Sequence, residues 1–453
     1  MQSTIRFCGG AGAVTGSNFL LDTGGSKILI DCGLSQGRHA AEELNWQPFS
    51  YDPASIPVLI VTHAHVDHIG RIPKLVRDGF KGRIISTEAT KALAEPLLLD
   101  SMELLAHDAR KHGREELYNE ADIARAMGMW EGVPFHEKQE LADGVSFRFL
   151  NSAHILGSGL VELSRGDTRL VFTGDLGSGN SLLLPQIDAL SGVKYLVMES
   201  VYGDRVRSKD SEHREKLEDI IEDTAARKGT LLIPAFSTER TQDLLFDIRA
   251  LMLEKRIPSM PVYADSPLAQ KITAAYLKYP QYFSAPIRER LEKGEDIFTF
   301  PELRFVENAD ESRKVAALPG PKIVIAGSGM SNGGRVHEHQ KYVLPDEKST
   351  MLVVGYQAAG SLGRRLVEGE RHVRLQGQET FVHCRIEAIY GYSAHMDSEQ
   401  LLEFVNQTAE SLKQVFVVMG EPISAGFLAQ RIRDYLGTKA IAPEANAEAK
   451  IDF

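Results

Sequence analysis

Short apolar runs separated by glycine-rich or charged connections dominate the first part of the chain, up to residue 201. Runs of this length, bounded by turn-forming residues, predict β-strands joined by tight turns. We expect strands at residues 4–7, 18–21, 28–30, 58–61, 83–86, 146–150, 159–163, 168–172 and 195–199. Residues 89–128 differ, because leucines recur there at helical spacing with charges opposite, which predicts a helical arm packed by one face.

Beyond residue 202 the pattern changes to longer helical stretches that alternate with short apolar strands. Helices are expected at 213–228, 238–255, 268–279 and 333–344, and strands at 230–233, 261–263, 323–325 and 351–354. This alternation predicts β-α-β units and a largely parallel sheet. Toward the end we expect a helix at 398–408, a strand at 415–418, a helix at 423–436, and a fraying tail after Pro443.

Composition and charge limit the class of protein. The chain has 453 residues with 43% hydrophobic content, enough for two or three domains, or for one large domain with an insertion. A net charge of −11 argues against a protein that coats nucleic acid, so a polyanion would have to be met by local cations. Cys8, Cys32 and Cys384 lack the spacing of a disulfide frame or a cysteine zinc site.

Neither an apolar run of about 18 residues nor a basic-then-apolar leader occurs in the sequence. A membrane span and a secretory signal are therefore not expected. We expect a cytoplasmic protein without a membrane partner.

The strongest chemical signal is the run His63-Ala64-His65-Val66-Asp67-His68, which follows an apolar strand at 58–61. His63 and His65, two apart on an extended backbone, point the same way and can hold one cation. Asp67 and His68 lie where the chain turns into a helix and can face a second cation. Paired hydrolytic metals lie about 3.5–4 Å apart, so the run predicts a two-metal site.

This run resembles the H-x-H-x-D-H signature of the metallo-β-lactamase fold. The other positions expected from that fold are present in order. Asp31 closes the strand that ends at residue 30, His154 lies within residues 151–158, and Asp175 follows the strand that ends at residue 172.

A second resemblance covers nearly the whole chain. A β-α-β insert that ends in Tyr392-Ser393-Ala394-His395 looks like the β-CASP branch of that fold, and the bacterial and archaeal ribonucleases related to the polyadenylation endonuclease are similar in residues 199–204, 233–240, 265–267, 327–330 and 333–335. The resemblance implies an α/β protein, a metallo-β-lactamase αββα sandwich with an inserted β-CASP α/β domain. The implied segments are 1–201 and 386–453 for the sandwich and 202–385 for the β-CASP domain.

The resemblance also implies a ligand scheme. One metal is assigned to His63, His65 and His154, the other to Asp67, His68 and His395, with Asp175 bridging the two. Asp31 would orient a ligand, and Glu199 matches the acidic position of the β-CASP part. The implied catalytic residues are Asp67, Glu199, His395 and Asp31. Imidazole and carboxylate ligands suit two Zn²⁺ best, with Mn²⁺ as the alternative.

Substrate-binding candidates lie in the insert. The turn Gly327-Ser328-Gly329-Met330 can offer backbone N–H groups to a phosphate, although a plain strand-to-helix turn is the alternative. The candidates are Ser328, Gly329, Met330, Arg335, Arg240 and Arg365, together with Arg364. For each arginine an ordinary surface ion pair is the alternative. Tyr202 and Phe236 are candidates for stacking on unpaired bases.

Two positions depart from the β-CASP pattern. Arg365 follows Gly360-Ser361-Leu362 where the pattern has a histidine, which leaves the proton donor for the leaving group undefined. Met419 precedes Gly420-Glu421 where relatives often have a histidine.

The function implied is a zinc-dependent ribonuclease that hydrolyses RNA phosphodiester bonds with a two-metal-bound hydroxide. It would act on single-stranded RNA, cut internally, and leave a 5′-phosphate and a 3′-hydroxyl. Alternatives are a 5′-exonuclease, a hydrolase of DNA or of a small ester or thioester on the same fold, and a non-catalytic RNA-binding scaffold. A homodimer stays open.

Overall fold

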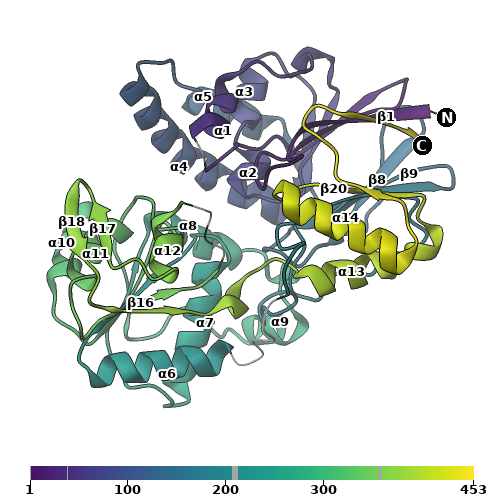
Figure 1. Cartoon of the computed structure of the whole chain (residues 1–453). Helices are drawn as coiled ribbons and strands as arrows, with labels where there is room; N and C mark the ends of the chain where they lie inside the picture. The colour runs from purple at the N-terminus through teal and green to yellow at the C-terminus, as the bar shows by residue number, and fades with distance from the viewer. Residues whose placement is uncertain (1, 38, 207–212, 356, 358–359) are drawn as a thin grey trace. The chain divides into compact units, whose positions relative to one another are not determined.

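The computed structural model of the chain describes residues 2–37, 39–206, 213–355, 357 and 360–453 (Figure 1). The chain divides into two compact units. The sandwich unit comprises Met1–Gly179, Leu184–Val206 and His395–Phe453, and the inserted unit comprises Asn180–Leu183 and Arg207–Ala394. We propose that they correspond to the two domains expected from the sequence.

Two seven-stranded sheets form the sandwich unit over the described residues. The order in the first is β22 (Glu448–Asp452), β1 (Gln2–Gly9), β2 (Asn18–Asp22), β3 (Lys27–Ile30), β4 (Val58–Ile60), β5 (Arg83–Thr87) and β6 (Trp130–Val133). The order in the second is β21 (Ala440–Ile441), β20 (Gln414–Val417), β11 (Tyr195–Met198), β10 (Thr168–Phe172), β9 (Gly159–Arg165), β8 (Val145–Asn151) and β7 (Gln139–Glu140). Strands β3 to β6 run parallel, as do β10, β11 and β20.

The two sheets pack face to face through a core of aromatic and branched side chains. Buried phenylalanines from both sheets fill this space, among them Phe7, Phe19, Phe147, Phe172 and Phe416. Phe19 of β2 stacks on Phe172 of β10 with ring centroids 6.0 Å apart. Because each fully buried side chain of this size contributes about 1.5–3 kcal/mol, this layer stabilises the packing of the two sheets against each other.

Helices cover the outer faces of both sheets (Figure 1). On the first sheet lie α1 (His39–Glu43), α2 (Val66–Ile69), α3 (Ile72–Arg77), α4 (Glu88–His112) and α5 (Glu120–Gly128). On the second lie α13 (Ser398–Asn406) and α14 (Pro422–Leu436), which bury Leu401, Phe404, Leu428 and Ile432. The unit is the αββα sandwich expected from the resemblance.

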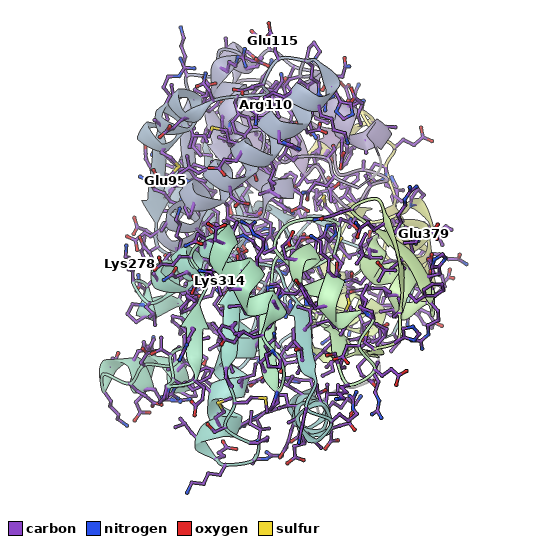
Figure 2. The ribbon with its side chains drawn as sticks, turned by 90° about the vertical axis from the view of Figure 1, so that its left-hand side faces the viewer. Glu95, Arg110, Glu115, Lys278, Lys314 and Glu379 are labelled. Carbon is purple, nitrogen blue, oxygen red and sulfur yellow. The ribbon has the colours of Figure 1, made fainter. Side chains whose placement is uncertain are left out.

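The predicted helical arm consists of two helices rather than one. Helix α4 ends at His112 and is capped by Gly113, whose φ of 64° is the left-handed conformation that glycine adopts without strain. Helix α5 begins with a capping box between Asn119 and Asp122. Glu95 and Arg110 of α4 lie on its exposed face (Figure 2), which agrees with a packing arm that has a solvated side.

A six-stranded parallel sheet forms the centre of the inserted unit over the described residues. Its order is β14 (Leu303–Phe305), β13 (Val262–Asp265), β15 (Lys322–Ala326), β12 (Thr230–Pro234), β16 (Thr350–Val353) and β19 (Arg385–Ala388). Its helices are α6 (His213–Ala226), α7 (Arg240–Leu253), α8 (Pro267–Tyr276), α9 (Ala285–Glu292), α10 (Ala309–Ala317), α11 (Val336–Val343) and α12 (Leu362–Val367). The predicted β-α-β alternation is confirmed.

The expectation of a fraying tail is wrong. Residues Glu448–Asp452 form β22, which pairs antiparallel with β1 from Gln2 to Arg6. The strand was not predicted for two reasons. Its segment is rich in Ala and Glu, which are not typical of strands, and its pairing partner β1 lies at the opposite end of the sequence. The insert also holds a hairpin of β17 (His372–Leu375) and β18 (Gln378–Phe381) that the apolar pattern did not indicate. No helix in the described part of the chain has the length and apolar character needed to cross a bilayer.

Candidate metal centre

Loops at the ends of strands in the sandwich unit bring together side chains that the sequence places far apart. The loop after β4 carries His63 and His65, and the first turn of α2 carries Asp67 and His68. The remaining predicted ligands come from the β8–β9 loop, from the end of β10 and from the residues before α13, namely His154, Asp175 and His395.

Three imidazoles and one carboxylate converge as the first donor group. Nδ1 of His65 lies 3.1 Å from Nε2 of His63 and 3.2 Å from Nε2 of His154. Oδ2 of Asp175 lies 3.5 Å from Nε2 of His63 and 3.4 Å from Nε2 of His154. All four donor atoms lie within 4.8 Å of one another.

These separations fit a tetrahedral metal site. With bonds of about 2.0–2.1 Å to zinc, tetrahedral ligand atoms lie about 3.3 Å from one another. The observed values of 3.1, 3.2, 3.4 and 3.5 Å bracket that spacing. Burial lowers the pKa of His65 and of His154 well below the usual range, so both imidazoles are neutral and can donate a lone pair.

The second oxygen of Asp175 faces away from this group toward His68. Oδ1 of Asp175 lies 3.3 Å from Nε2 of His68, and both atoms are buried without a hydrogen bond among the described residues. Burial alone would lower the pKa of His68, but the carboxylates of Asp175 and Asp31 outweigh it and raise that pKa well above its usual range. A carboxylate with one oxygen in each group is what a bridging ligand requires.

Asp67 and His395 do not complete the second group as the ligand scheme implies. Oδ2 of Asp67 lies 3.9 Å from Nε2 of His68. His395 instead gathers with Asp175 and Glu199, and its Nδ1 lies 3.1 Å from Oε1 of Glu199. Among the described residues, therefore, Asp67, His68 and His395 do not converge as one set of three donors.

Asp31 holds His68 in place. It is fully buried, its Oδ2 lies 2.7 Å from Nδ1 of His68, and its Oδ1 accepts the backbone N–H of Thr62 at 2.8 Å. The hydroxyl of Ser17 donates to the same Oδ2 at 3.0 Å. With Nδ1–H donated to Asp31, Nε2, which faces Asp175, is the nitrogen through which His68 would bind a cation in place of its proton.

Thr62 is a contributor that the sequence analysis missed. Its hydroxyl donates to Oδ2 of Asp31 at 2.9 Å and lies 3.1 Å from Nδ1 of His63. Since the single proton goes to Asp31, the hydroxyl oxygen accepts Nδ1–H of His63 and leaves the lone pair on Nε2. The adjacency of Thr62 to His63 was the available signal.

Glu199 plays the corresponding part for His395. It is fully buried, its Oε1 accepts the backbone N–H of Leu176 at 2.6 Å, and its Oε2 accepts that of Val201 at 3.2 Å. Burial alone would lower the pKa of His395, but the Glu199 carboxylate outweighs it and raises that pKa.

The four candidate arginines of the inserted unit are all in ion pairs. Arg240 pairs with Asp243 at 3.3 Å, Arg335 with Asp265 at 3.2 Å, Arg364 with Glu368 at 2.6 Å, and Arg365 with Glu370 at 2.6 Å. The ion-pair alternative therefore describes these side chains in the structure.

The turn with Ser328, Gly329 and Met330 joins β15 to α11. Nε2 of Gln357 donates to the carbonyl of Gly329 at 3.0 Å, and the backbone N–H of Gly363 donates to the carbonyl of Met330 at 3.3 Å. These bonds fix the carbonyl side of the turn.

Met419, the second departure, lies in the core between the two sheets. It is 2% exposed, and its backbone N–H donates to the carbonyl of Gly10 at 2.7 Å. Its thioether thus fills apolar space, and this position supplies no imidazole to the metal centre.

Comparisons with known proteins agree with this geometry. Three family profiles match in order: "Metallo-beta-lactamase superfamily" over residues 11–187, "Beta-Casp domain" over 241–366, and "Zn-dependent metallo-hydrolase RNA specificity domain" over 381–443. The fold and the donor groups define a metal-dependent hydrolase of the metallo-β-lactamase superfamily.

Relatives narrow the class further. Ribonuclease TTHA0252 of Thermus thermophilus is 34% identical over 414 residues, which cover 91% of this chain and 92% of that protein. Transcription termination factor FttA of Methanocaldococcus jannaschii is 30% identical over 457 residues, which cover 97% of this chain and 70% of that protein. The chain belongs to the β-CASP family of ribonucleases.

One solved structure, a protein of unknown function from Enterococcus faecalis, matches with a TM-score of 0.56 and 12% identity over 100% of both chains. At this identity the match shows the fold alone.

Proposed function

We propose that this protein is an RNA endonuclease that holds two zinc ions and leaves fragments with a 5′-phosphate and a 3′-hydroxyl. The observation that carries the proposal is the split carboxylate of Asp175, with Oδ2 among three imidazoles at tetrahedral spacing and Oδ1 facing His68. Three imidazole nitrogens favour zinc over manganese, which prefers oxygen ligands.

The surrounding residues prepare the imidazoles for that role. Asp31 and Thr62 engage Nδ1 of His68 and of His63, so Nε2 of each ring is the nitrogen left to bind a metal. Glu199 fixes the orientation of His395 through Nδ1. We assign Asp31 and Glu199 as positioning residues, because both are fully buried beside a histidine.

When bound, paired zinc ions lower the pKa of a coordinated water and stabilise negative charge on a phosphodiester. Burial raises the pKa of Asp67 above its usual range, which favours a role for this carboxyl in holding or moving a proton. His395 lies beside Asp175 and Glu199, and its side chain is 20% exposed. Because this imidazole is partly open to solvent, we assign it to meet the leaving oxygen of the substrate.

RNA is the substrate we assign, because the profile that covers residues 381–443 describes RNA specificity and the relative from Thermus thermophilus is named a ribonuclease. We further propose that the RNA is single-stranded and that the protein acts in the cytoplasm. A homodimer stays a prediction.

The test is incubation of metal-loaded protein with 5′-labelled RNA and a DNA of matched sequence. Internal RNA fragments that a ligase accepts at their 5′-phosphates support the proposal. Cleavage of DNA alone, or release of single nucleotides from the 5′ end, would overturn the substrate or the endonuclease assignment. Retained RNA binding with no turnover at any metal loading would favour the scaffold alternative.

A further inference from the structure

In the sheet of the inserted unit, the order in which the chain adds strands reverses between β12 and β15. After β12 the chain crosses β15 to reach β13, and after β15 it crosses β12 in the other direction to reach β16. Because parallel crossovers are right-handed, α7 and α11 cover opposite faces of the sheet. In open α/β sheets such a switch point leaves a crevice outside the carboxyl ends of the two strands, where ligands bind.

The two loops at this crevice are in contact. Phe236 follows β12 and Gly329 follows β15, and a Cβ placed on Gly329 would lie 2.8 Å from ring carbon Cδ2 of Phe236. The ring therefore lies against the bare backbone of Gly329, and 41% of Phe236 remains exposed. An aromatic ring held rigidly and left half open is a stacking surface for an unpaired base.

Buried polar atoms without partners lie on the same two loops. Oγ1 of Thr238 and Oγ of Ser331 make no hydrogen bond among the described residues, although Thr238 is 4% exposed and Ser331 is 0% exposed. An unsatisfied buried hydroxyl costs about 1–3 kcal/mol, and such groups in native structures call for an explanation. The same kind of unpaired polar atom occurs at the metal centre, on His68 and Asp175.

The charged groups near the crevice serve the fold instead. Asp265, fully buried at the end of β13, accepts hydrogen bonds from Arg335 at 3.2 Å, from His339 at 2.7 Å and from Ser312. Arg335 also donates to the carbonyl of Asn308 at 2.6 Å. This network fixes the start of α11, at the end of the β15–α11 loop, so recognition falls to the ring and the hydroxyls.

We propose that this crevice binds one unpaired nucleotide of the RNA chain, with its base stacked on Phe236 and its phosphate held by the hydroxyls of Thr238 and Ser331. The proposal rests on the proposed ribonuclease function and adds the residues that hold the strand. The backbone N–H groups of Gly329 and Met330, which make no hydrogen bond within the described residues, can assist at the phosphate.

The first test replaces Phe236 by Ala and by Trp, with Phe381→Ala as the matched control. Phe381 belongs to the same unit and is 62% exposed, but it lies on the β17–β18 hairpin. A stacked base is worth about 1–3 kcal/mol, so Phe236→Ala should raise KM for single-stranded RNA about 5- to 150-fold at unchanged kcat, while Phe236→Trp retains the wild-type KM.

A fluorescent base gives a direct readout of stacking. Single-stranded RNA with one 2-aminopurine should be quenched by the wild type and by Phe236→Trp, and not by Phe236→Ala. Quenching that survives in Phe236→Ala would overturn the assignment of the ring. Because the measurement follows binding, it needs no turnover.

The hydroxyls are tested by Ser331→Ala and Thr238→Val. Each should weaken RNA binding and, because an unsatisfied buried hydroxyl is removed, raise Tm in the absence of RNA. Removal of a merely structural hydroxyl would instead lower Tm in the absence of RNA, and that result, or unchanged RNA binding, would refute its assignment to phosphate. Failure of wild-type protein to bind or cut RNA would count against the proposed function, whereas wild-type cleavage with Phe236→Ala indistinguishable from Phe381→Ala would overturn only this inference.

Discussion

Replacing Asp31 by Asn should weaken zinc binding at one of the two donor groups of the metal centre and leave the other almost unchanged. The change preserves shape but removes the charge that accepts Nδ1–H of His68 at 2.7 Å and the backbone N–H of Thr62 at 2.8 Å. The amide offers one carbonyl oxygen where the carboxylate had two. Either the bond to His68 or one of the bonds to Thr62 and Ser17 must be lost.

The expected magnitude follows from these contacts. Loss of a partner that orients a metal-binding histidine typically costs 10- to 100-fold in metal affinity or activity. Asp31 touches His68 directly, but it reaches His63 only through the Thr62 hydroxyl and does not touch His65 or His154. Affinity should therefore fall about 10- to 100-fold for one equivalent of zinc and stay close to wild type for the other.

The assay is titration of the metal-free protein with zinc against a chromophoric chelator, with far-UV circular dichroism to verify folding. Thr62→Val is the companion variant, since it removes the hydroxyl that links Asp31 to His63 and keeps the backbone N–H. Wild-type affinity for both equivalents in Asp31→Asn would refute the positioning role of Asp31. Equal weakening of both equivalents would refute the separation of the two groups.

Further predictions concern activity, metal content and pH. Asp175→Asn should abolish RNA cleavage with an unchanged far-UV spectrum, because one carboxylate serves both donor groups; retained turnover in the purified variant would contradict this. Dialysis against a weak chelator should remove one equivalent of metal before the other, as measured by atomic emission, since His63, His65, His154 and Asp175 converge as four donors whereas Asp67 and His68 lie 3.9 Å apart; simultaneous loss would argue against unequal sites. Burial raises the pKa of Asp247 from 3.8 to about 6. The hydrogen bond from Tyr392 lowers this pKa, whereas the nearby charge of Asp243 raises it further. This acid is destabilising once ionised, so its own contribution to stability is fully present below about pH 4 and falls by up to about 3 kcal/mol as the pH rises through 6. Asp247→Asn should remove this step in thermal unfolding between pH 4 and 7, and an unchanged step would show that another group causes it.

Local pattern was sufficient for much of the metal centre. The order of His63, His65, Asp67 and His68 after an apolar strand sets the direction and spacing of those side chains, because a strand end and a first helical turn have nearly invariant geometry. Alternating short strands and helices likewise indicated a parallel sheet in the inserted unit, and the structure confirms it.

Tertiary structure decided which groups face one another. His395 lies 196 positions from Glu199, and no local rule states that its Nδ1 contacts that carboxylate. The last strand, β22, exists because β1 offers it a free edge, and the composition of its own residues gave no sign of it. Likewise, the sequence did not show that the candidate arginines form ion pairs with carboxylates of the inserted unit.

The division has one physical cause. Periodicity and motif spacing report interactions between residues close in the chain, which the sequence determines by itself. The partners of a buried carboxylate, the edge that accepts a strand and the loops that meet at Phe236 and Gly329 depend on packing between residues far apart, which only the folded chain decides.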